Sequence, residues 1–401
     1  MKILQINCVY RKGSTGKITY DLHMELLAAG IESVVCYGRG DGVNALGVYK
    51  TCTENYSKLN NAVSRVTGIM YGGCLVSTNK LISIIKKENP DIVHLQCING
   101  HFVNIYRIVR WLKKENIPTV LTLHAEFMYT GGCGYAFDCN QWKNPSGCGY
   151  SGCPRWRAET KSLFFDRALT MWKRMKDAFH GFNNLKIVSV SPWLMERAKK
   201  SAIFGDYEHS VILNGLDTSV FHKYDTEEMR SEFANKKIVF YATPYFSLDK
   251  NHIKGGWYVC ELAKRIPDIQ FLVAGSLVEE VEVPDNVKLL GKITNQTTLA
   301  KYYSLADLTL LTSKRETFSM ICAESLCCGT PIVGFKAGAP EQIALEKYSE
   351  FVDYGDLDFL EETVRLWLDK EKKDDISEKA KEKYSKELMA EHYIEIYYEL
   401  V

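Results

Sequence analysis

The feature that most constrains this chain is an alternation of short apolar runs with amphipathic helical stretches along nearly its whole length. An alternation of this kind predicts parallel β-sheets that carry helices on both faces. The expected strands are Lys2–Asn7, Ser33–Tyr37, Ile92–Gln96, Thr119–His124, Lys186–Ser189, Ile238–Ala242, Phe271–Ala274, Val287–Leu290, Leu308–Thr312 and Pro331–Phe335.

A chain of 401 residues is too long for one hydrophobic core. Two sets of βα units in succession therefore predict the α/β class, with two doubly wound, Rossmann-like domains that face a cleft and cover residues 1–210 and 211–384. Ligands of such domains bind at the carboxyl ends of the strands. A charged helical tail, about 385–401, could pack on its own domain or return to the first one. The apolar stripe of the whole tail from Ile376 to Val401 is Tyr384, Met389, Tyr393, Ile396 and Tyr397.

The charge of the chain is divided unevenly. Residues 1–210 hold 27 Lys and Arg against 16 Asp and Glu, a balance of +11, whereas the remainder holds 23 against 33, a balance of −10. A basic first half suits anionic lipid headgroups or a phosphate-bearing acceptor. No nucleic-acid-binding motif is present, and we expect no nucleic-acid partner.

The location of the protein is predicted from what the sequence lacks. No apolar run reaches the roughly 18–20 residues of a membrane span, and residues 1–7 lack the anatomy of a signal peptide. We expect a cytoplasmic protein that contacts the inner face of the membrane peripherally.

The stretch RKGSTGK near the N-terminus contains the Gly-Lys pair of a nucleotide-hydrolysing P-loop without its spacing. A P-loop needs a glycine where this chain has Arg11, and a Ser or Thr where it has Ile18. The stretch is better explained as a strand, a glycine turn and a helix start, which offers N–H donors at the carboxyl end of the strand. We expect Gly13, Gly16 and Lys17 on the acceptor side of the cleft; a turn without a ligand is the alternative.

Four of the 13 cysteines gather in one Gly- and Tyr-rich loop, with the spacing C-x5-C-x8-C-x4-C. Four thiolates can hold a structural zinc ion tetrahedrally, although neither half has the usual C-x2-C spacing. Free thiols, or disulfides formed in vitro, are the alternatives. The cysteines concerned are Cys133, Cys139, Cys148 and Cys153.

The strongest chemical signal is a pair of glutamates in LLTSKRETFSMICAESLCCGTPIVGF. Glu316 and Glu324 are eight positions apart, and a helix from Phe318 onward would separate them by about 12 Å along its axis. That distance is close to the one between the sugar and the ribose of a nucleotide-diphosphate sugar. The helix start suits the diphosphate, whereas a capped helix with two solvated glutamates is the alternative. The N–H groups at this start belong to Ser319, Met320 and Ile321.

This segment resembles the E-x7-E signature of the retaining glycosyltransferases of family 4, which have the GT-B architecture. The surrounding motifs match in order over almost the entire chain: VILNGLDTSVF, DKNHIKGG, IQFLVAGS and LAKYYSLADLTLLTS before the glutamates, and GTPIVGFKAGAPEQI after them. In the first half, PDIVHLQCINGHF, TLHAEFMYTGGCGYAFDC and VSVSPWL resemble a branch that builds capsular and exopolysaccharide repeats on lipid carriers.

The resemblance implies a hexosyltransferase-type enzyme with a UDP- or GDP-sugar donor and a glycan or lipid-linked saccharide acceptor. Its second domain binds the donor and its first the acceptor, without a cofactor or a catalytic metal. Glu316 orients the sugar and Glu324 holds the ribose. Lys254 and Lys250 stabilise the leaving diphosphate, and His124 lies against the sugar and phosphate. The other implied contacts are Phe318, Ser319, Met320, Ile321 and Gly275 on the donor side, and Gly13, Gly16, Lys17, His94 and Asn214 on the acceptor side.

The chain departs from the family pattern at two places, and the missing arginine motivates a rival hypothesis. Lys250 stands where the family commonly has an arginine, and a lysine cannot fork onto two phosphate oxygens. The acid that often follows the cleft histidine is replaced by Ala125, with Glu126 one place on. The rival is a non-catalytic subunit that binds a nucleotide sugar or a partner transferase.

Overall fold

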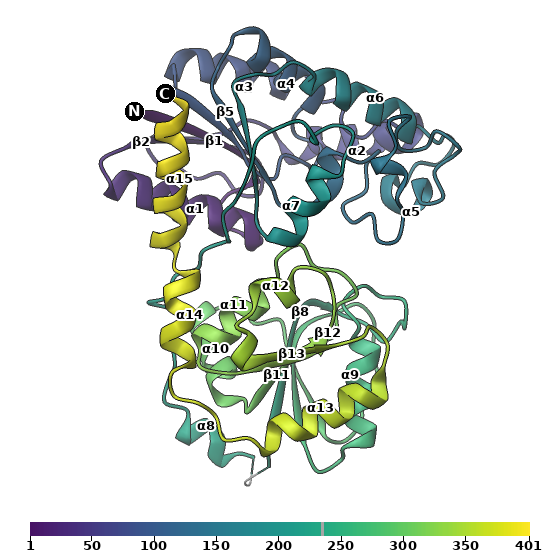
Figure 1. Ribbon diagram of the computed structural model, residues 1–401, viewed down its shortest axis with the longest axis vertical. Helices are drawn as coiled ribbons and strands as arrows, with labels where there is room; N and C mark the ends of the chain where they lie inside the picture. Colours follow the sequence, from purple (N-terminus) through teal and green to yellow (C-terminus); the bar gives the residue numbers. More distant parts are fainter. Residues whose placement is uncertain (234–235) are drawn as a thin grey trace. The chain divides into compact units, whose positions relative to one another are not determined.

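The computed structural model describes residues 1–233 and 236–401. The chain divides into two compact units (Figure 1), one made of Met1–Leu213 with Met389–Val401 and the other of Asn214–Leu388. The division lies close to the boundary at 210/211 that the sequence predicts, and the last helix belongs with the first unit.

The first unit is built on a seven-stranded parallel sheet with the order β3-β2-β1-β4-β5-β6-β7. Its strands are β1 (Lys2–Val9), β2 (Glu32–Arg39), β3 (Val48–Lys50), β4 (Ile92–Leu95), β5 (Thr119–Leu123), β6 (Leu185–Ser189) and β7 (His209–Val211). Its helices are α1 (Gly13–Ala28), α2 (Glu54–Thr67), α3 (Leu75–Glu88), α4 (Ile105–Lys114), α5 (Trp156–Thr160), α6 (Ala168–Phe179), α7 (Pro192–Lys199) and most of α15 (Lys386–Leu400).

The second unit repeats this plan with six parallel strands in the order β10-β9-β8-β11-β12-β13. Its strands are β8 (Ile238–Phe246), β9 (Gln270–Leu277), β10 (Val287–Gly291), β11 (Leu308–Leu311), β12 (Ile332–Phe335) and β13 (Ser349–Val352). Its helices are α8 (Glu227–Ser231), α9 (Gly256–Arg265), α10 (Gln296–Leu305), α11 (Met320–Cys327), α12 (Pro340–Ile343), α13 (Leu357–Asp369) and α14 (Ile376–Tyr384).

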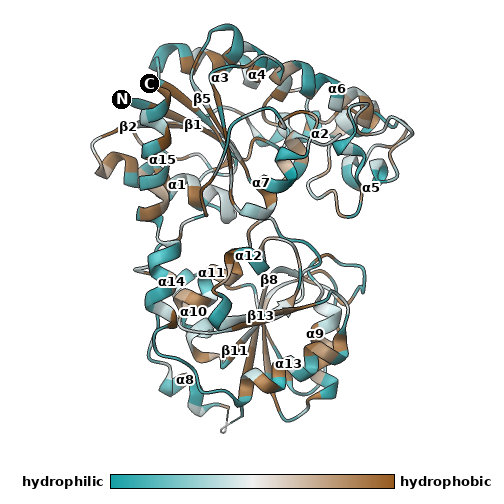
Figure 2. Ribbon diagram, in the orientation of Figure 1, coloured by the Kyte–Doolittle hydropathy of each residue, from teal (hydrophilic) through white to brown (hydrophobic). Residues whose placement is uncertain are grey.

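The two doubly wound sheets confirm the predicted fold class, and all ten expected strands are present. The central strands are buried on both faces, so their residues form near-continuous apolar runs; Figure 2 shows them brown among helices of mixed colour. Three strands were not expected: β3, β7 and β13. Each is a short edge strand that is partly exposed, and its sequence therefore lacks a continuous apolar run.

The apolar stripe of the C-terminal tail is shared between the units. Tyr384 is buried in the second unit, where its hydroxyl donates to the carbonyl oxygen of Ile343. The remaining stripe, on α15 (yellow in Figure 1), packs on the first unit, with Tyr393 and Tyr397 fully buried. Helix α6 likewise buries its apolar face, which includes Met171, Trp172 and Met175, within the first unit.

The start of α1 gives its two glycines different roles. Gly13 is exposed and has a φ of +64°, a left-handed conformation that favours glycine. Gly16 is buried against β1, and a Cβ there would lie 3.0 Å from Cγ2 of Val9. The missing side chain of Gly16 therefore lets α1 lie close to the end of β1, and its place on the acceptor side of a cleft stays a prediction.

Substitution of Gly16 by valine should destabilise the first unit by about 1–3 kcal/mol, since the added methyl groups overpack the contact with Val9. Urea unfolding followed by circular dichroism measures the change. Gly42→Val is the matched control, because Gly42 is exposed and has open space around it. Equal midpoints for the two variants would contradict this role of Gly16.

Candidate active site

The candidate donor site lies at the point where the strand order of the second sheet reverses. Strands β8 and β11 are neighbours there, and the chain leaves them in opposite directions, toward β9 and β12. Ligands of doubly wound folds bind beside the carboxyl ends of such strands. The segments that follow β8 and β11 carry Lys254, Glu316 and Ser319.

Lys254 and Glu316 form an ion pair, with 2.6 Å between Nζ and Oε1. Their side chains are 20% and 9% exposed, so the pair is largely withdrawn from water. Two backbone hydrogen bonds fix Glu316: its N–H donates to Ala337, and its carbonyl oxygen accepts from Ala339. A carboxylate and an ammonium group are thus held in contact at the carboxyl end of the sheet.

Two side chains that the sequence analysis did not single out hold Lys254 in place. The hydroxyl of Tyr241 donates to the carbonyl oxygen of Lys254 at 2.5 Å, and Thr312 Oγ1 lies 3.0 Å from the same oxygen. Gly255 has a φ of +71°, and a Cβ there would come within 2.2 Å of the carbonyl oxygen of Thr312. The Lys254-Gly255 turn therefore requires glycine, whereas a buried Tyr on a strand and a buried Thr just after one carry no sequence signal of this role.

The start of α11 contains a buried hydroxyl group. Ser319 precedes the helix with a φ of +84°, and among the described residues its Oγ has no hydrogen-bond partner. The first-turn N–H groups of a helix also lack acceptors within the helix, and they favour an anion. A buried hydroxyl without a partner beside such N–H groups fits a ligand that carries phosphate oxygens.

Of the remaining donor-side residues, Glu324 and Lys250 are charged, whereas Phe318 and Gly275 are uncharged and buried. Glu324 lies on α11, where its Oε2 accepts a 2.9 Å hydrogen bond from the buried hydroxyl of Tyr303 on α10. Lys250 is exposed, with its ammonium group 4.6 Å from the ring centroid of Trp257. Phe318 is buried. Gly275 is also buried, and a Cβ there would lie 2.7 Å from Thr243, so its role is the close packing of β9 on β8.

In the first unit, His124 directly follows β5 and is almost fully buried. Its Nε2 lies 2.8 Å from Oε1 of Gln96, and Nε2 of Gln96 donates in turn to Gln5. An amide oxygen only accepts, so Nε2 of His124 carries the proton. Burial lowers the pKa of His124 to about 4, which keeps the imidazole neutral at pH 7. Gln96 is a positioning residue that the sequence analysis missed.

His94 does not lie where the sequence analysis expected it. The side chain, on β4, is fully buried; Nδ1 is bonded to Tyr397 at 2.6 Å and Nε2 to Thr122 at 2.7 Å. Burial lowers the pKa of His94 to about 3. With both ring nitrogens engaged, His94 anchors α15 to the sheet rather than contacting an acceptor. Asn214 is also buried, as the first residue of the second unit, whereas Lys17 on α1 is partly exposed.

These two histidines make stability depend on pH. The unfolded chain protonates a histidine near pH 6.5, whereas folding disfavours protonation, so the unfolded state binds more protons below that pH. Stability should be full above about pH 6.5 and decline as the pH falls, with His124 accounting for about 3 kcal/mol at pH 4. Urea unfolding between pH 4 and 7 measures this decline. His124→Gln should remove the His124 share of the decline and leave that of His94, whereas the exposed His392→Gln should leave the whole decline in place; a decline unchanged in His124→Gln would contradict the assignment.

Glu126, the acid one place from the expected position, is an anchor for the loop that follows β5. It is fully buried and accepts from Nε of Arg197 at 2.6 Å and from the N–H of Ala136 at 2.6 Å.

Within the described residues, no three metal-ligating side chains come together. The geometry thus gives the zinc alternative no support.

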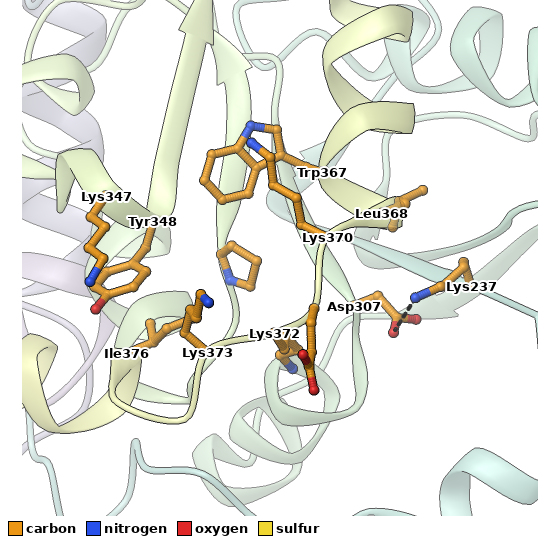
Figure 3. Close-up of a pocket in the computed structure, with 12 residues that line it drawn as sticks. Lys237, Asp307, Lys347, Tyr348, Trp367, Leu368, Lys370, Lys372, Lys373 and Ile376 are labelled. Carbon is orange, nitrogen blue, oxygen red and sulfur yellow. Dashed lines mark ion pairs between the residues drawn. The ribbon is translucent and has the colours of Figure 1, made fainter.

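A lysine-rich pocket of about 430 Å³ lies at the other end of the second sheet (Figure 3). Lys237, Asp307 and Pro331 each directly precede a strand, which places the pocket at the amino ends of the strands. Lys372 there donates to the carbonyl oxygen of Ala306 at 2.8 Å, and Asp307 pairs with Arg230. The Lys372 contact ties the end of α10 to the segment after α13, and the Asp307 pair ties the start of β11 to α8. Because it lies at the amino ends of the strands, the pocket is distinct from the candidate donor site.

Two family models together match most of the chain and assign it to a protein family. The model of Glycosyltransferase Family 4 matches residues 15–220, and that of Glycosyl transferases group 1 matches residues 226–383. The chain belongs to glycosyltransferase family 4. It is an enzyme of the hexosyltransferase type that uses a nucleotide-sugar donor.

Individual relatives of this glycosyltransferase are distant in sequence. It is 22% identical over 363 residues to WcaC of Escherichia coli (strain K12), named as a colanic acid biosynthesis glycosyl transferase, covering 86% of this chain and 85% of the relative. It is 24% identical over 347 residues to the N-acetyl-alpha-D-glucosaminyl L-malate synthase of Bacillus anthracis, covering 82% and 79%.

Solved structures share the GT-B fold of this glycosyltransferase over essentially the full chain. The sucrose-phosphate synthase of Thermosynechococcus elongatus gives a TM-score of 0.68 at 16% identity, covering 100% of this chain and 99% of that one. Anabaena HepE in complex with UDP and glucose gives 0.65 at 14% identity, covering 99% of each chain. Across the described residues, none of the helices has both the length and the apolar character needed to cross a bilayer.

Proposed function

We propose that this glycosyltransferase moves a sugar from a nucleotide-diphosphate sugar to a glycan or lipid-linked saccharide, with retention of anomeric configuration, in polysaccharide biosynthesis. The observation that carries the proposal is the Lys254–Glu316 pair, which belongs to the same switch point as the buried Ser319 hydroxyl at the start of α11. Together these groups offer positive charge and N–H donors for a diphosphate and a carboxylate for sugar hydroxyls.

The proposed mechanism starts with an exchange of partners. The donor diphosphate takes the start of α11 and the ammonium group of Lys254, which releases Glu316 to accept from hydroxyls of the sugar. As the bond between sugar and diphosphate breaks, the acceptor hydroxyl bonds to the same sugar carbon on the same face and passes its proton to the leaving diphosphate. Lys254 and the N–H groups stabilise the negative charge on that leaving group. Glu324, oriented by Tyr303, accepts from the ribose hydroxyls. Lys250 adds positive charge to the segment that carries Lys254.

We assign the binding site of the acceptor to the first unit. His124 is neutral and is oriented by Gln96, so it can exchange hydrogen bonds with hydroxyl groups of the substrates without adding charge. Gly13 and Lys17 at the start of α1 add N–H donors and a cation. The colanic acid relative supports a polysaccharide product, and the complex of HepE with UDP and glucose makes UDP-sugars the first donors to test, with GDP-sugars as the alternative. A lipid-linked acceptor would bring the enzyme to the inner face of the membrane as a peripheral protein.

The test is sugar transfer by the purified chain. UDP- and GDP-sugars are incubated with lipid-pyrophosphate saccharides, and NMR of the product gives the configuration of the new linkage. Retention is the expected result, and inversion would contradict the proposed mechanism. The rival, a non-catalytic binding subunit, is favoured by Lys250 in the usual place of an arginine. It predicts that donors bind without being consumed.

A further inference from the structure

Helix α2 is turned the opposite way from an ordinary surface helix. Ser57 and Ser64 are its buried residues, and the hydroxyl of Ser57 donates to the carbonyl oxygen of Gly100 at 3.1 Å. Leu59, Val63 and Val66 are spaced to share one face, and that face is exposed, with Leu59 at 60%. A surface helix normally buries its apolar face and exposes its polar one. These three apolar side chains therefore do not contribute to the hydrophobic core of the first unit.

A second apolar segment is attached to the end of this helix. Leu163, Phe164 and Phe165 follow α5 and are each about half exposed or more, Phe164 at 64%. The N–H of Leu163 donates to the carbonyl oxygen of Arg65 in the last turn of α2 at 2.7 Å. Ser162 closes the turn, since its hydroxyl donates to the carbonyl oxygen of Phe165. The three side chains are thus held in an ordered turn instead of being buried.

These six residues define what we call the α2 patch. A single exposed apolar residue is ordinary in a soluble protein, but a group attached to one helix marks a surface that binds something. The patch is flanked by exposed basic side chains, while two acids of the same segments are paired: Arg39 bonds Glu54, and Arg155 bonds Glu159. One exposed acid, Asp166, follows Phe165 and accepts from the backbone N–H groups of Cys153 and Ala168, and the flanking basic residues outnumber it. The flanking basic residues are Lys58, Arg65, Arg157, Lys161 and Arg167.

We propose that the α2 patch docks the enzyme on an anionic lipid bilayer, with the apolar side chains in the interface and the basic ones among the headgroups. The inference rests on the proposed function, because a lipid-linked acceptor has to be reached at a membrane surface. Apolar insertion combined with basic attraction is the chemistry of interfacial membrane binding. The excess of +11 in residues 1–210 adds long-range attraction to the same surface. Basic flanks favour an anionic surface over a second copy of this chain, which would present the same positive charges.

Vesicle flotation of the full chain tests the proposal. Vesicles of 70:30 phosphatidylcholine and phosphatidylglycerol are compared with pure phosphatidylcholine, at low and high salt. The wild type should bind the anionic vesicles and lose binding as salt rises. L163S/F164S should lower the bound fraction by about tenfold or more, since two apolar side chains no longer enter the interface. The matched control is F359S/L366S, which removes two apolar side chains that are each about half exposed from α13 of the second unit.

Equal binding by wild type and L163S/F164S would overturn the proposal, as would a loss of the same size in F359S/L366S. Light scattering of the free proteins tests the other occupant: a wild-type dimer that L163S/F164S makes monomeric would assign the patch to a second copy and overturn lipid docking. Donor consumption in solution separates this inference from the proposed function, because L163S/F164S should consume donor at the wild-type rate. A wild type that binds vesicles but transfers no sugar would contradict the function alone.

Discussion

Replacement of Glu316 by glutamine should lower the rate of sugar transfer by about 10²–10³-fold, the usual cost of removing a charged group that acts in the transition state. Glutamine keeps the shape of the side chain but removes the carboxylate that would accept from the sugar. It also releases the ammonium group of Lys254, which in the wild type is bonded to Glu316 at 2.6 Å. The diphosphate would then meet an unpaired cation, so the affinity for donor should be unchanged or higher while kcat falls.

Separate measurements of the transfer rate and of the donor affinity test whether kcat falls while donor binding is kept. Glu362→Gln is the matched control, because it removes the same charge from an exposed position on α13. Donor consumption by Glu316→Gln at the wild-type rate would contradict the mechanism. A loss of donor affinity with an unchanged kcat would instead indicate that Glu316 only holds the site together.

Replacement of Tyr397 by alanine should cost the first unit about 3–5 kcal/mol, the usual penalty for removing a large buried aromatic side chain. The loss has two causes: a cavity opens under α15, and Nδ1 of His94 loses its 2.6 Å partner inside the sheet. Because the net stability of a domain is about 5–15 kcal/mol, the variant should be close to unfolding at 37 °C.

The neighbouring residue provides the control for this prediction. Tyr398 is 66% exposed, so Tyr398→Ala should change stability by no more than about 0.5 kcal/mol. Hydrogen exchange of β4 and β5 identifies which strands lose protection. Tyr397→Ala should expose these strands while the second unit stays protected. Equal stability of the two variants would show that α15 contributes little to the first unit.

The sequence predicts the fold well because buried parallel strands have to be apolar throughout. Strands such as β4 and β11 are covered on both faces, and both were expected. The edge strand β7 was missed, since half-exposed residues leave no continuous apolar run. Helix α11 begins at Met320 rather than Phe318, because a local φ of +84° at Ser319 delays the helix.

The candidate site was predictable in part. Lys254 and Glu316 were identified by motif, and the structure brings their side chains into contact. Tyr241 and Gln96, which position site residues, could not be found, because a buried polar residue on a strand or directly after one resembles many others in sequence. His94 was misplaced for the same reason: a histidine near a strand end has no local signal that distinguishes a ligand contact from a core hydrogen bond.

The central claim is that the second unit binds a nucleotide-diphosphate sugar through Lys254 and the start of α11. A thermal-shift panel of UDP-, GDP- and ADP-sugars tests it most directly, since a ligand at 100 times its Kd stabilises the folded state by about 2.7 kcal/mol. At least one donor should raise the melting temperature of the wild type, and Lys254→Met should lose most of that shift. No shift with any donor, or the same shift in Lys254→Met, would contradict the account.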